Sequence, residues 1–299
     1  MKIWVFAEKY TALNELCLGA RQLGDRVEGV VVGSPEGVIC ADKVWSIPAQ
    51  DGAMLEDYSE SIAALVNKEK PDFLLVAPTK RGKCIAGRLA AMIGASVITD
   101  VMELTQDGEA KRMVYGGAAV RREKAATSTA VIMVGPGVLA VSTEAATSQA
   151  EVETVEFIEP KTKMKVISKE QKPKVSVNLA SAKRVVGVGR GIAQSEDINM
   201  ARQLAEVIGG EVGCSRPIAE GEKWMPKETY IGVSGLILTP EVYFALGISG
   251  QVQHMVGINR SKVVIAINKD KNAPIFKQAD YGLVGDLYKI LPTLINQLK

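Results

Sequence analysis

The sequence predicts an α/β protein of two domains, each a mostly parallel sheet flanked by helices. Three observations support this prediction. The chain has 299 residues, enough for about two domains of ordinary size. Short β-branched runs alternate with helical patterns in both halves, which favours parallel sheets covered on both faces. Between the halves, residues 160–175 are rich in Lys and contain two prolines, the composition of an exposed linker.

The first half begins with a strand-like apolar run at 2–6 and then alternates helices and strands. We expect helices at 11–23, 56–68 and 83–93, and strands at 26–32 and 72–77. From 111 to 157 the pattern changes to short strand-like runs separated by Gly116-Gly117 and Gly135-Pro136-Gly137. We expect this stretch to add antiparallel strands to the first sheet without any helix.

The second half continues the alternation with a buried-strand pattern at 184–188, a glycine loop and a helix from about 196. Ser195 suits the N-cap of that helix, Glu196 and Asp197 its first turn, and Gly209-Gly210 its end. Later elements are expected as a strand at 242–248, a helix at 251–256, a strand at 262–267 and a last helix at 285–298. We place the domains at 1–180, with the linker, and at 181–299.

Composition excludes several classes of protein. Lys and Arg number 36 against 34 Asp and Glu, a balance that does not suit nucleic acid or a polybasic membrane surface. The four cysteines are far apart, so they offer neither a zinc site nor a thioredoxin-like motif, and a reducing compartment is expected. No signal-peptide pattern opens the sequence, and the uncharged stretch 125–143 is broken by Gly-Pro-Gly. We therefore expect a cytoplasmic protein without membrane insertion.

The single histidine, His254, limits the available chemistry. A hydrolase triad could be built only around it, and a site of several histidines for a metal is excluded. A lone histidine is most often structural, but this one follows Gly247-Ile248-Ser249-Gly250 and stands near Gln251 and Gln253 at a predicted helix start. Such a cluster of donors suits an anion or an electron-rich ring. We predict no catalytic residue and no metal.

The segment Gly187-Val188-Gly189-Arg190-Gly191, after a strand and before a helix, resembles a dinucleotide-binding loop. The full motif would need glycine at the position of Ile192, so the pattern is compatible both with a phosphate site and with an ordinary tight turn. Arg190 favours the phosphate, because a guanidinium can grip phosphate with two hydrogen bonds. In contrast, Lys80-Arg81-Gly82-Lys83 lacks the first glycine and the Ser/Thr of a P-loop, and we interpret it as a solvated basic helix start, with a partner contact as the alternative.

Polar residues stand at several other predicted strand ends of the second half: Ser215 with Arg216, Ser234, and Asn268. Two carboxylates, Asp280 and Asp286, lie near the last predicted helix. Each alone is compatible with a helix cap or a solvated group. Because ligands of α/β folds bind at the carboxyl ends of strands, each is also a candidate ligand contact.

Considered together, these residues resemble the alpha subunits of electron-transfer flavoproteins. The resemblance is carried by residues 240–254, 265–270 and 273–282, with Gly189-Arg190-Gly191 and Ser215-Arg216 in the expected order. It covers the chain from about residue 183 to the end, whereas the first domain matches mainly in layout. Residues 214–220, followed by Lys223-Trp224-Met225, are similar to the FixB-type branch of the family.

The resemblance implies an electron carrier without substrate turnover of its own. The C-terminal domain would be a doubly wound FAD-binding fold, and the N-terminal domain would hold a FixA-type beta subunit. Electrons would pass between a flavin dehydrogenase or reductase of acyl-CoA type and another redox partner, such as a quinone oxidoreductase or a ferredoxin-like protein. Two alternatives are a nucleotide-dependent oxidoreductase with its own small substrate and a nucleotide-binding structural subunit without redox chemistry.

The resemblance also implies which residues contact FAD. Arg190 and Ser215 would lie near the phosphates, Arg216 and Ser234 near the flavin ring, residues 249–254 along the pyrophosphate and ring edge, Asn268 near the ribityl or phosphate region, and Asp286-Leu287 near the adenosine half. The complete predicted set is Arg190, Ser215, Arg216, Val233, Ser234, Gly247, Ser249, Gly250, Gln251, Val252, Gln253, His254, Asn268, Asp286 and Leu287.

One departure from the family pattern concerns residues 232–235. Many members have Gly-Gln-Thr-Gly where this chain has Gly-Val-Ser-Gly. The hydroxyl is kept at Ser234, but the glutamine amide is lost at Val233, so the flavin potential is expected to differ from that of other members. His254 and Arg216 would stabilise the negative charge of a reduced flavin and so raise its potential.

Overall fold

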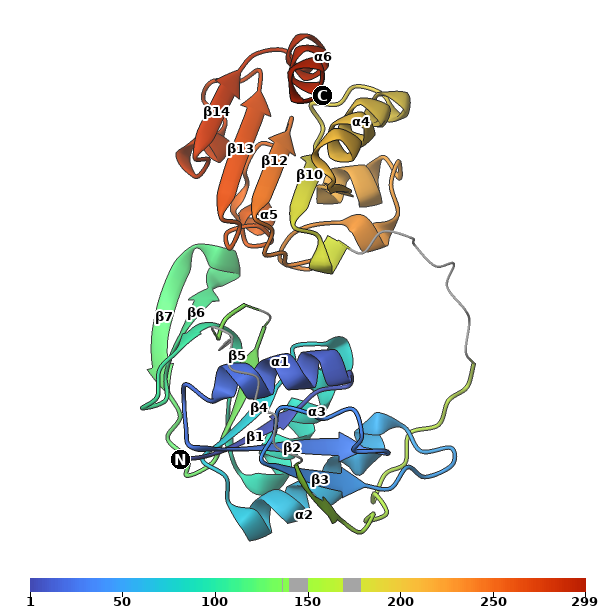
Figure 1. Ribbon diagram of the computed structural model, residues 1–299, viewed down its shortest axis with the longest axis vertical. Coiled ribbons are helices and arrows are strands. Elements are labelled where there is room, and N and C mark those ends of the chain that lie inside the picture. The colour runs from blue at the N-terminus through green and yellow to red at the C-terminus, as the bar shows by residue number, and fades with distance from the viewer. Residues whose placement is uncertain (136, 140–149, 169–178) are drawn as a thin grey trace. The chain divides into compact units, whose positions relative to one another are not determined.

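The computed structural model describes residues 1–135, 137–139, 150–168 and 179–299. These residues form two compact units, unit 1 around a nine-stranded sheet and unit 2 around a five-stranded sheet (Figure 1). The predicted fold class, two α/β units with mostly parallel sheets flanked by helices, is confirmed. The domain boundary after residue 180 stays a prediction, and most of the residues on its N-terminal side, 169–178, lie outside the described part of the chain.

The sheet of unit 1 has the strand order β7-β6-β5-β8-β4-β1-β2-β3-β9. Its strands are β1 (Lys2–Phe6), β2 (Arg26–Val32), β3 (Lys43–Ile47), β4 (Phe73–Val76), β5 (Ser96–Leu104), β6 (Glu109–Val114), β7 (Ala119–Lys124), β8 (Ala130–Val134) and β9 (Glu151–Thr154). Only the β5–β6 and β6–β7 pairs are antiparallel. The expected antiparallel addition is therefore right for β6 and β7 and wrong for β8 and β9, which pair in parallel. All residues of β8 are buried and apolar, as is typical of a central parallel strand.

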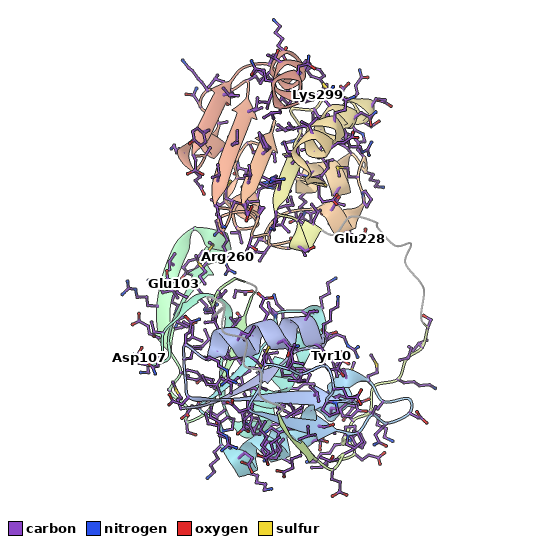
Figure 2. All side chains as sticks on the ribbon, in the orientation of Figure 1. Tyr10, Glu103, Asp107, Glu228, Arg260 and Lys299 are labelled. Atoms are coloured by element: carbon purple, nitrogen blue, oxygen red, sulfur yellow. The ribbon has the colours of Figure 1, made fainter. Side chains whose placement is uncertain are left out.

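Three helices cover the two faces of this sheet: α1 (Tyr10–Ala20), α2 (Ser59–Glu69) and α3 (Lys80–Ile93). Alternate residues of β1 enter opposite cores, because successive side chains of a strand point to opposite faces. Ile3 and Val5 belong to the core that contains α1, whereas Trp4 and Phe6 belong to the core that contains α2 and α3. Figure 1 shows α1 and α2 on opposite sides of the sheet. Charged side chains such as those of Glu103 and Asp107 lie on the outside (Figure 2).

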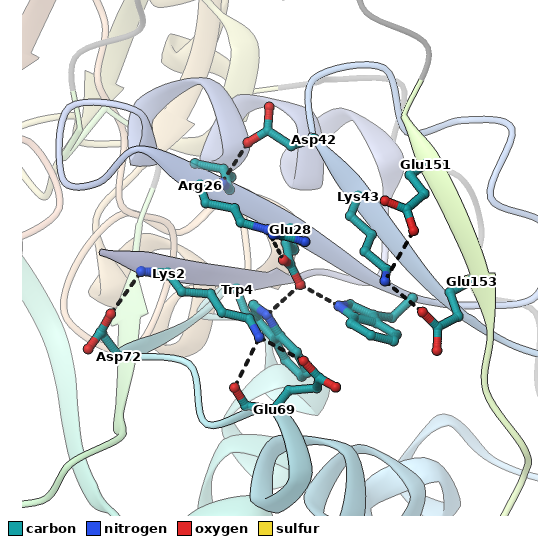
Figure 3. Close-up of polar contacts among 12 residues, drawn as sticks. Lys2, Trp4, Arg26, Glu28, Asp42, Lys43, Glu69, Asp72, Glu151 and Glu153 are labelled. Atoms are coloured by element: carbon teal, nitrogen blue, oxygen red, sulfur yellow. Dashed lines mark hydrogen bonds and ion pairs between the residues drawn. The ribbon is translucent and has the colours of Figure 1, made fainter.

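A buried carboxylate on β2 forms hydrogen bonds with side chains of β1 and β3 in unit 1. Glu28 on β2 is fully buried, and its Oε2 accepts hydrogen bonds from the indole N–H groups of Trp4 (2.9 Å) and Trp45 (2.6 Å). Its Oε1 accepts a hydrogen bond from Arg26 Nε at 2.5 Å (Figure 3). Lys43 Nζ lies 4.0 Å from the centre of the Trp45 ring. The carboxylate is therefore paired within the sheet, as buried polar groups must be.

The sheet of unit 2 is entirely parallel and has the order β11-β10-β12-β13-β14. Its strands are β10 (Arg184–Val188), β11 (Glu211–Cys214), β12 (Val242–Leu246), β13 (Val263–Asn268) and β14 (Tyr281–Val284). Helices α4 (Ile198–Ile208) and α6 (Leu287–Leu298) share one core, and α5 (Val252–Met255) packs on the opposite face. This arrangement is the doubly wound fold that was expected, and the strand order reverses direction at β10.

Two helix starts in unit 2 differ from expectation. Ser195 is not an N-cap: its hydroxyl donates to Glu196 Oε1 (3.0 Å), and a 3-10 turn precedes α4, which begins only at Ile198. Helix α5 has four residues, shorter than the expected 251–256. Gly209 ends α4 as expected, with a left-handed φ of 61°. No helix among the described residues is long and apolar enough to cross a membrane.

Candidate functional site

The carboxyl ends of all five strands of unit 2 contribute residues to one pocket of about 980 Å³. Arg190 follows β10, Ser215 follows β11, Ser249 follows β12, Asn268 ends β13 and Asp286 follows β14. The chain reverses its direction of winding between β10 and β12, and doubly wound folds bind ligands at such a switch point. The pocket is therefore in the position that this fold uses for binding.

Glycines let the loops after β10 and β12 approach each other closely. Gly191 N donates to Gly247 O (3.0 Å), and a Cβ on Gly191 would lie 2.5 Å from Gly247 Cα. Gly247 has a φ of 60°, a left-handed conformation that favours glycine. These contacts explain the glycines at 191 and 247 by loop packing, and they leave the side chain of Arg190 exposed at the pocket.

The residue at 187 has a different reason to be glycine. Gly187 lies within β10, and an added Cβ would be 1.8 Å from the hydroxyl oxygen of Tyr243. The sequence pattern grouped Gly187 with the loop glycines. In the structure it instead leaves room for a buried tyrosine of the neighbouring strand.

His254 forms part of the pocket wall while being almost completely buried. Its Nε2 lies 2.9 Å from the Tyr243 hydroxyl, and its Nδ1 has no hydrogen-bond partner among the described residues. Burial lowers the pKa of His254 from 6.5 to about 4, and a hydrogen-bond interaction with the backbone of Ile231, too poor in geometry to count as a full hydrogen bond, opposes this shift. The imidazole is therefore neutral at neutral pH. Because α5 is a single turn, the expected help from a helix dipole is small.

The two arginines of the site differ in their surroundings. Arg216 Nε donates to Glu220 Oε2 at 2.5 Å, and this hydrogen bond raises the pKa of Arg216. Glu220 also pairs with Lys227 at 3.1 Å. Arg216 is thus restrained by a carboxylate of the following turn, whereas Arg190 lies between two loop glycines with its side chain exposed.

Most of the predicted cofactor-binding residues lie on the pocket wall. These are Arg190, Ser215, Arg216, Val233, Gly247, Ser249, Gln251, Gln253, His254, Asn268, Asp286 and Leu287. The other three are neighbours of lining residues. Ser234 Oγ is hydrogen-bonded to the Tyr230 hydroxyl (3.0 Å), Gly250 packs against the backbone of Ile275, and Val252 begins α5 with 40% of its surface exposed.

Sequence reasoning missed several residues of the wall, notably Tyr230 and Tyr288. The Tyr288 hydroxyl accepts from Ala193 N (2.9 Å) and donates to Asp197 Oδ2 (2.6 Å), which ties the start of α6 to the loop after β10. Asp286 caps α6 by accepting from Tyr288 N (2.9 Å). A tyrosine in the first turn of a helix that follows a strand end was the available signal. For Tyr230, which lies in an irregular segment, there was none.

Comparison with known proteins agrees with this geometry. The family model of the electron transfer flavoprotein domain matches residues 3–160, and that of the electron transfer flavoprotein FAD-binding domain matches residues 178–259. The chain belongs to the electron transfer flavoprotein family. Subunit YdiR of Escherichia coli K12 is 46% identical, with 99% of this chain and 97% of YdiR covered. The FixB proteins of E. coli O127:H6 and O6:H1 are 43% identical, with 99% of this chain and 98% of each relative covered.

These matches identify an alpha subunit of FixB type. Such a subunit is an electron carrier, FAD is the cofactor of its C-terminal domain, and the family implies a FixA-type beta subunit as partner. The alternative of an oxidoreductase with its own substrate is thereby excluded. The pocket fits FAD: its volume is at the upper end of the range of about 300–1,000 Å³ for ligand pockets, and it combines arginine and hydroxyl donors with an apolar wall that includes Ile231 and Ile248.

Proposed function

We propose that this FixB-type subunit holds FAD in the pocket of unit 2 and passes electrons between a flavin dehydrogenase or reductase of acyl-CoA type and a second redox partner. A quinone oxidoreductase or a ferredoxin-like protein would suit the second role. The observation that carries the proposal is the convergence of five strand ends on one pocket lined by Arg190, Ser215 and His254. When bound, FAD supplies the electron-accepting chemistry that the side chains of the pocket lack.

The loops after β10 and β11 suit the phosphate groups. Arg190 offers a guanidinium for bidentate hydrogen bonds, and Ser215, on the wall of the same pocket, offers a hydroxyl. Both follow strands whose carboxyl ends contribute to the pocket. The N–H groups of Gly189, Gly191 and Gly247 already donate to backbone carbonyls, so we assign the phosphates to the two side chains. These groups would hold the diphosphate and so fix the position of the whole cofactor.

Asn268 and Asp286 each keep capacity for a ligand after their structural bonds are counted. Asn268 Nδ2 donates to Ile248 O (2.9 Å) and its Oδ1 accepts from Asp270 N (3.0 Å), which leaves the second amide N–H. Asp286 uses Oδ1 to cap α6, which leaves Oδ2 to accept a ribose hydroxyl. Asn268 thus suits the ribityl or phosphate region and Asp286 the adenosine half.

The remaining donors suit the flavin ring. His254, Gln253 and Arg216 line the same pocket, and a ring that gains negative charge on reduction is stabilised by donors at its edge. Val233 offers no amide, and the hydroxyl of Ser234 is bonded to Tyr230. His254 and Arg216 are therefore the groups expected to set the flavin potential in this subunit.

The deciding experiment is co-purification with the FixA-type subunit, followed by an absorption spectrum and a flavin count. We expect the heterodimer to contain FAD. We expect the double variant Arg190→Ala, Ser215→Ala to lose the FAD that this chain binds. A natively purified heterodimer that holds no flavin and takes up no added FAD would instead support a structural subunit without redox chemistry. NAD(P)H-dependent turnover by the isolated chain would contradict the carrier role.

A second measurement tests the flavin edge of the site. His254→Ala should make the midpoint potential of the bound FAD more negative by the equivalent of about 1 kcal/mol, the net value of one hydrogen bond. His254→Gln, which keeps a donor, should shift it less. Spectroelectrochemistry of the heterodimer measures both, and an unchanged potential in His254→Ala would remove His254 from the ring.

A further inference from the structure

A tyrosine and a histidine form a buried pair behind the FAD pocket. Tyr243 on β12 is fully buried, and its hydroxyl oxygen lies 2.9 Å from Nε2 of His254, which is 7% exposed. The ring centres are 6.1 Å apart. The other ring nitrogen, Nδ1, has no hydrogen-bond partner in the described part of the chain, and His254 lines the pocket. The pair therefore joins the core of unit 2 to its binding site.

The neighbouring strand is shaped to admit this pair. In the parallel register of β10 and β12, Val185 lies opposite Tyr243 and Gly187 opposite Ala245. A Cβ at Gly187 would be 1.8 Å from the Tyr243 hydroxyl oxygen, so the hydroxyl occupies the space that a side chain would fill. A strand-interior glycine is unfavourable by itself, so this one serves the tyrosine. Three elements, β10, β12 and α5, thus build one contact.

The protonation state of the pair follows from burial and geometry. Burial lowers the pKa of His254 to about 4 and raises the pKa of Tyr243 far above its usual range, so both groups are neutral at neutral pH. A neutral imidazole has one N–H and one lone pair. A phenol that donates to Nε2 pairs its own buried proton, whereas a phenol that accepts from Nε2–H leaves that proton without this acceptor. Each arrangement leaves one proton without a full hydrogen bond, Nδ1–H in the first and the phenol O–H in the second. The imidazole borders the pocket and the backbone of Ile231 favours a proton on its ring, whereas the phenol is enclosed in the core. Donation to Nε2 is therefore favoured.

We propose that Tyr243 is a positioning residue that fixes His254 as the Nδ1–H tautomer, so that the pocket receives an N–H donor and not a lone pair. The inference rests on the proposed function in one respect, that the acceptor is the flavin ring of FAD. Reduction adds electron density to the carbonyl and nitrogen atoms of that ring. A donor held in place before reduction needs no rearrangement when the charge arrives.

The single histidine of the chain makes the tautomer directly measurable. The chain, labelled with ¹⁵N only at histidine and paired with an unlabelled beta subunit, gives NMR signals from His254 alone. We expect a protonated Nδ1 and an unprotonated Nε2, with and without FAD. In Tyr243→Phe the ratio of Nδ1–H to Nε2–H should fall about fivefold, the equivalent of one lost hydrogen bond, because a free neutral imidazole prefers the Nε2–H form.

The matched control removes a buried phenol elsewhere. Tyr58→Phe deletes a hydroxyl of a 2% exposed tyrosine that accepts from Gln50 N in unit 1, and it should leave the His254 signals unchanged. The potential of bound FAD supplies a second readout, and it should become more negative in Tyr243→Phe and stay constant in Tyr58→Phe.

Each failure has a separate signature. If the wild-type chain holds His254 as the Nε2–H tautomer, the inference is wrong. This measurement uses no variant, so it decides the question even if Tyr243→Phe does not fold. An unchanged tautomer in a folded Tyr243→Phe also overturns it. An altered tautomer with an unchanged potential refutes the link to the flavin. A heterodimer that binds no FAD contradicts the proposed function, whereas the tautomer of its histidine still decides the role of Tyr243.

Discussion

The two units of this chain have the same type of switch point but fill it differently. In unit 1 the strand order reverses between β1 and β4, and the carboxylate of Glu8, after β1, accepts a hydrogen bond from Thr79, after β4. Thr79 also caps α3 by accepting from Gly82 N (2.9 Å). In unit 2 the corresponding loops, after β10 and β12, meet through backbone contacts of glycines. Unit 1 thus uses its own carboxylate where unit 2 leaves room for an anionic ligand.

The same contrast holds for two buried polar side chains. The oxygens of Glu28 in unit 1 are bonded to two indoles and an arginine of the same sheet. In unit 2, His254 lines the pocket and pairs one ring nitrogen with Tyr243, whereas the other, Nδ1, is buried without a hydrogen-bond partner among the described residues. A buried polar atom without a protein partner calls for a ligand more strongly than a strand-end loop does by itself.

The largest effect should come from breaking the internal pairing of unit 1. Glu28→Ala leaves the indoles of Trp4 and Trp45 and the guanidinium of Arg26 without their acceptor, and we expect the free energy of unfolding to fall by about 3–5 kcal/mol. Urea unfolding followed by tryptophan fluorescence measures this, because two of the three tryptophans report on the site. Glu28→Gln keeps an oxygen for the indoles and should lose less than half as much. Equal losses would show that the hydrogen bonds to the indoles contribute little.

Much of the fold followed from local patterns, and the failures have a common cause. Strands β1 and β2 have the predicted bounds, since each is a mostly apolar, β-branched run that begins at a basic residue. Strand β3 was not predicted, because Lys43 and Ser46 interrupt its apolar pattern. Lys43 can be buried because its ammonium group packs on the Trp45 ring and pairs with acidic residues of β9, contacts that the local sequence does not indicate. The direction of β8 and β9 was wrong, because the direction of pairing depends on distant strands and not on the local pattern.

The site was predictable to the extent that it depends on strand ends. Residues such as Arg190 and Ser215 could be grouped, because the carboxyl ends of parallel strands share one edge of a sheet. The pairing of Tyr243 with His254 was not predictable, since it depends on the register of β10 and β12 and on the missing side chain at Gly187. Contacts between elements of this kind leave no periodic signal in the sequence.

A second prediction uses the pH dependence of unit 2. The folded chain holds His254 neutral down to about pH 4, whereas the unfolded chain binds a proton below about 6.5. The stability that depends on a neutral His254 is therefore complete above pH 6.5 and is lost as the pH falls to about 4. At roughly 1.4 kcal/mol per pKa unit, the loss is about 3 kcal/mol. The difference in unfolding free energy between the wild type and His254→Gln should shrink over this range, and parallel pH profiles would contradict the prediction.

A matched pair of glycine substitutions sharpens the comparison further. Gly247→Ala places a Cβ 2.5 Å from Gly191 Cα in a left-handed backbone conformation. We expect the free energy of unfolding to fall by about 2 kcal/mol and the subunit to retain less FAD. Gly87→Ala, inside α3 of unit 1, meets no atom within 4 Å and should stabilise by about 0.5–1 kcal/mol. Thermal unfolding and a flavin count measure both variants. The same sign for both would refute the packing role assigned to the loop glycines of unit 2.

The smallest effect concerns the exposed arginine at the switch point of unit 2. Arg190→Ala removes a guanidinium that we place on the FAD phosphates, and the dissociation constant for FAD should rise about tenfold, or about 1.4 kcal/mol. Since Arg190 is exposed, the effect should decrease as ionic strength rises. Arg202→Ala removes an exposed arginine from α4 that is bonded to Asn199 and does not line the pocket. Equal weakening by the two substitutions, measured by titration of the flavin-free heterodimer, would indicate general attraction of charge and would remove the specific phosphate contact that distinguishes unit 2 from unit 1.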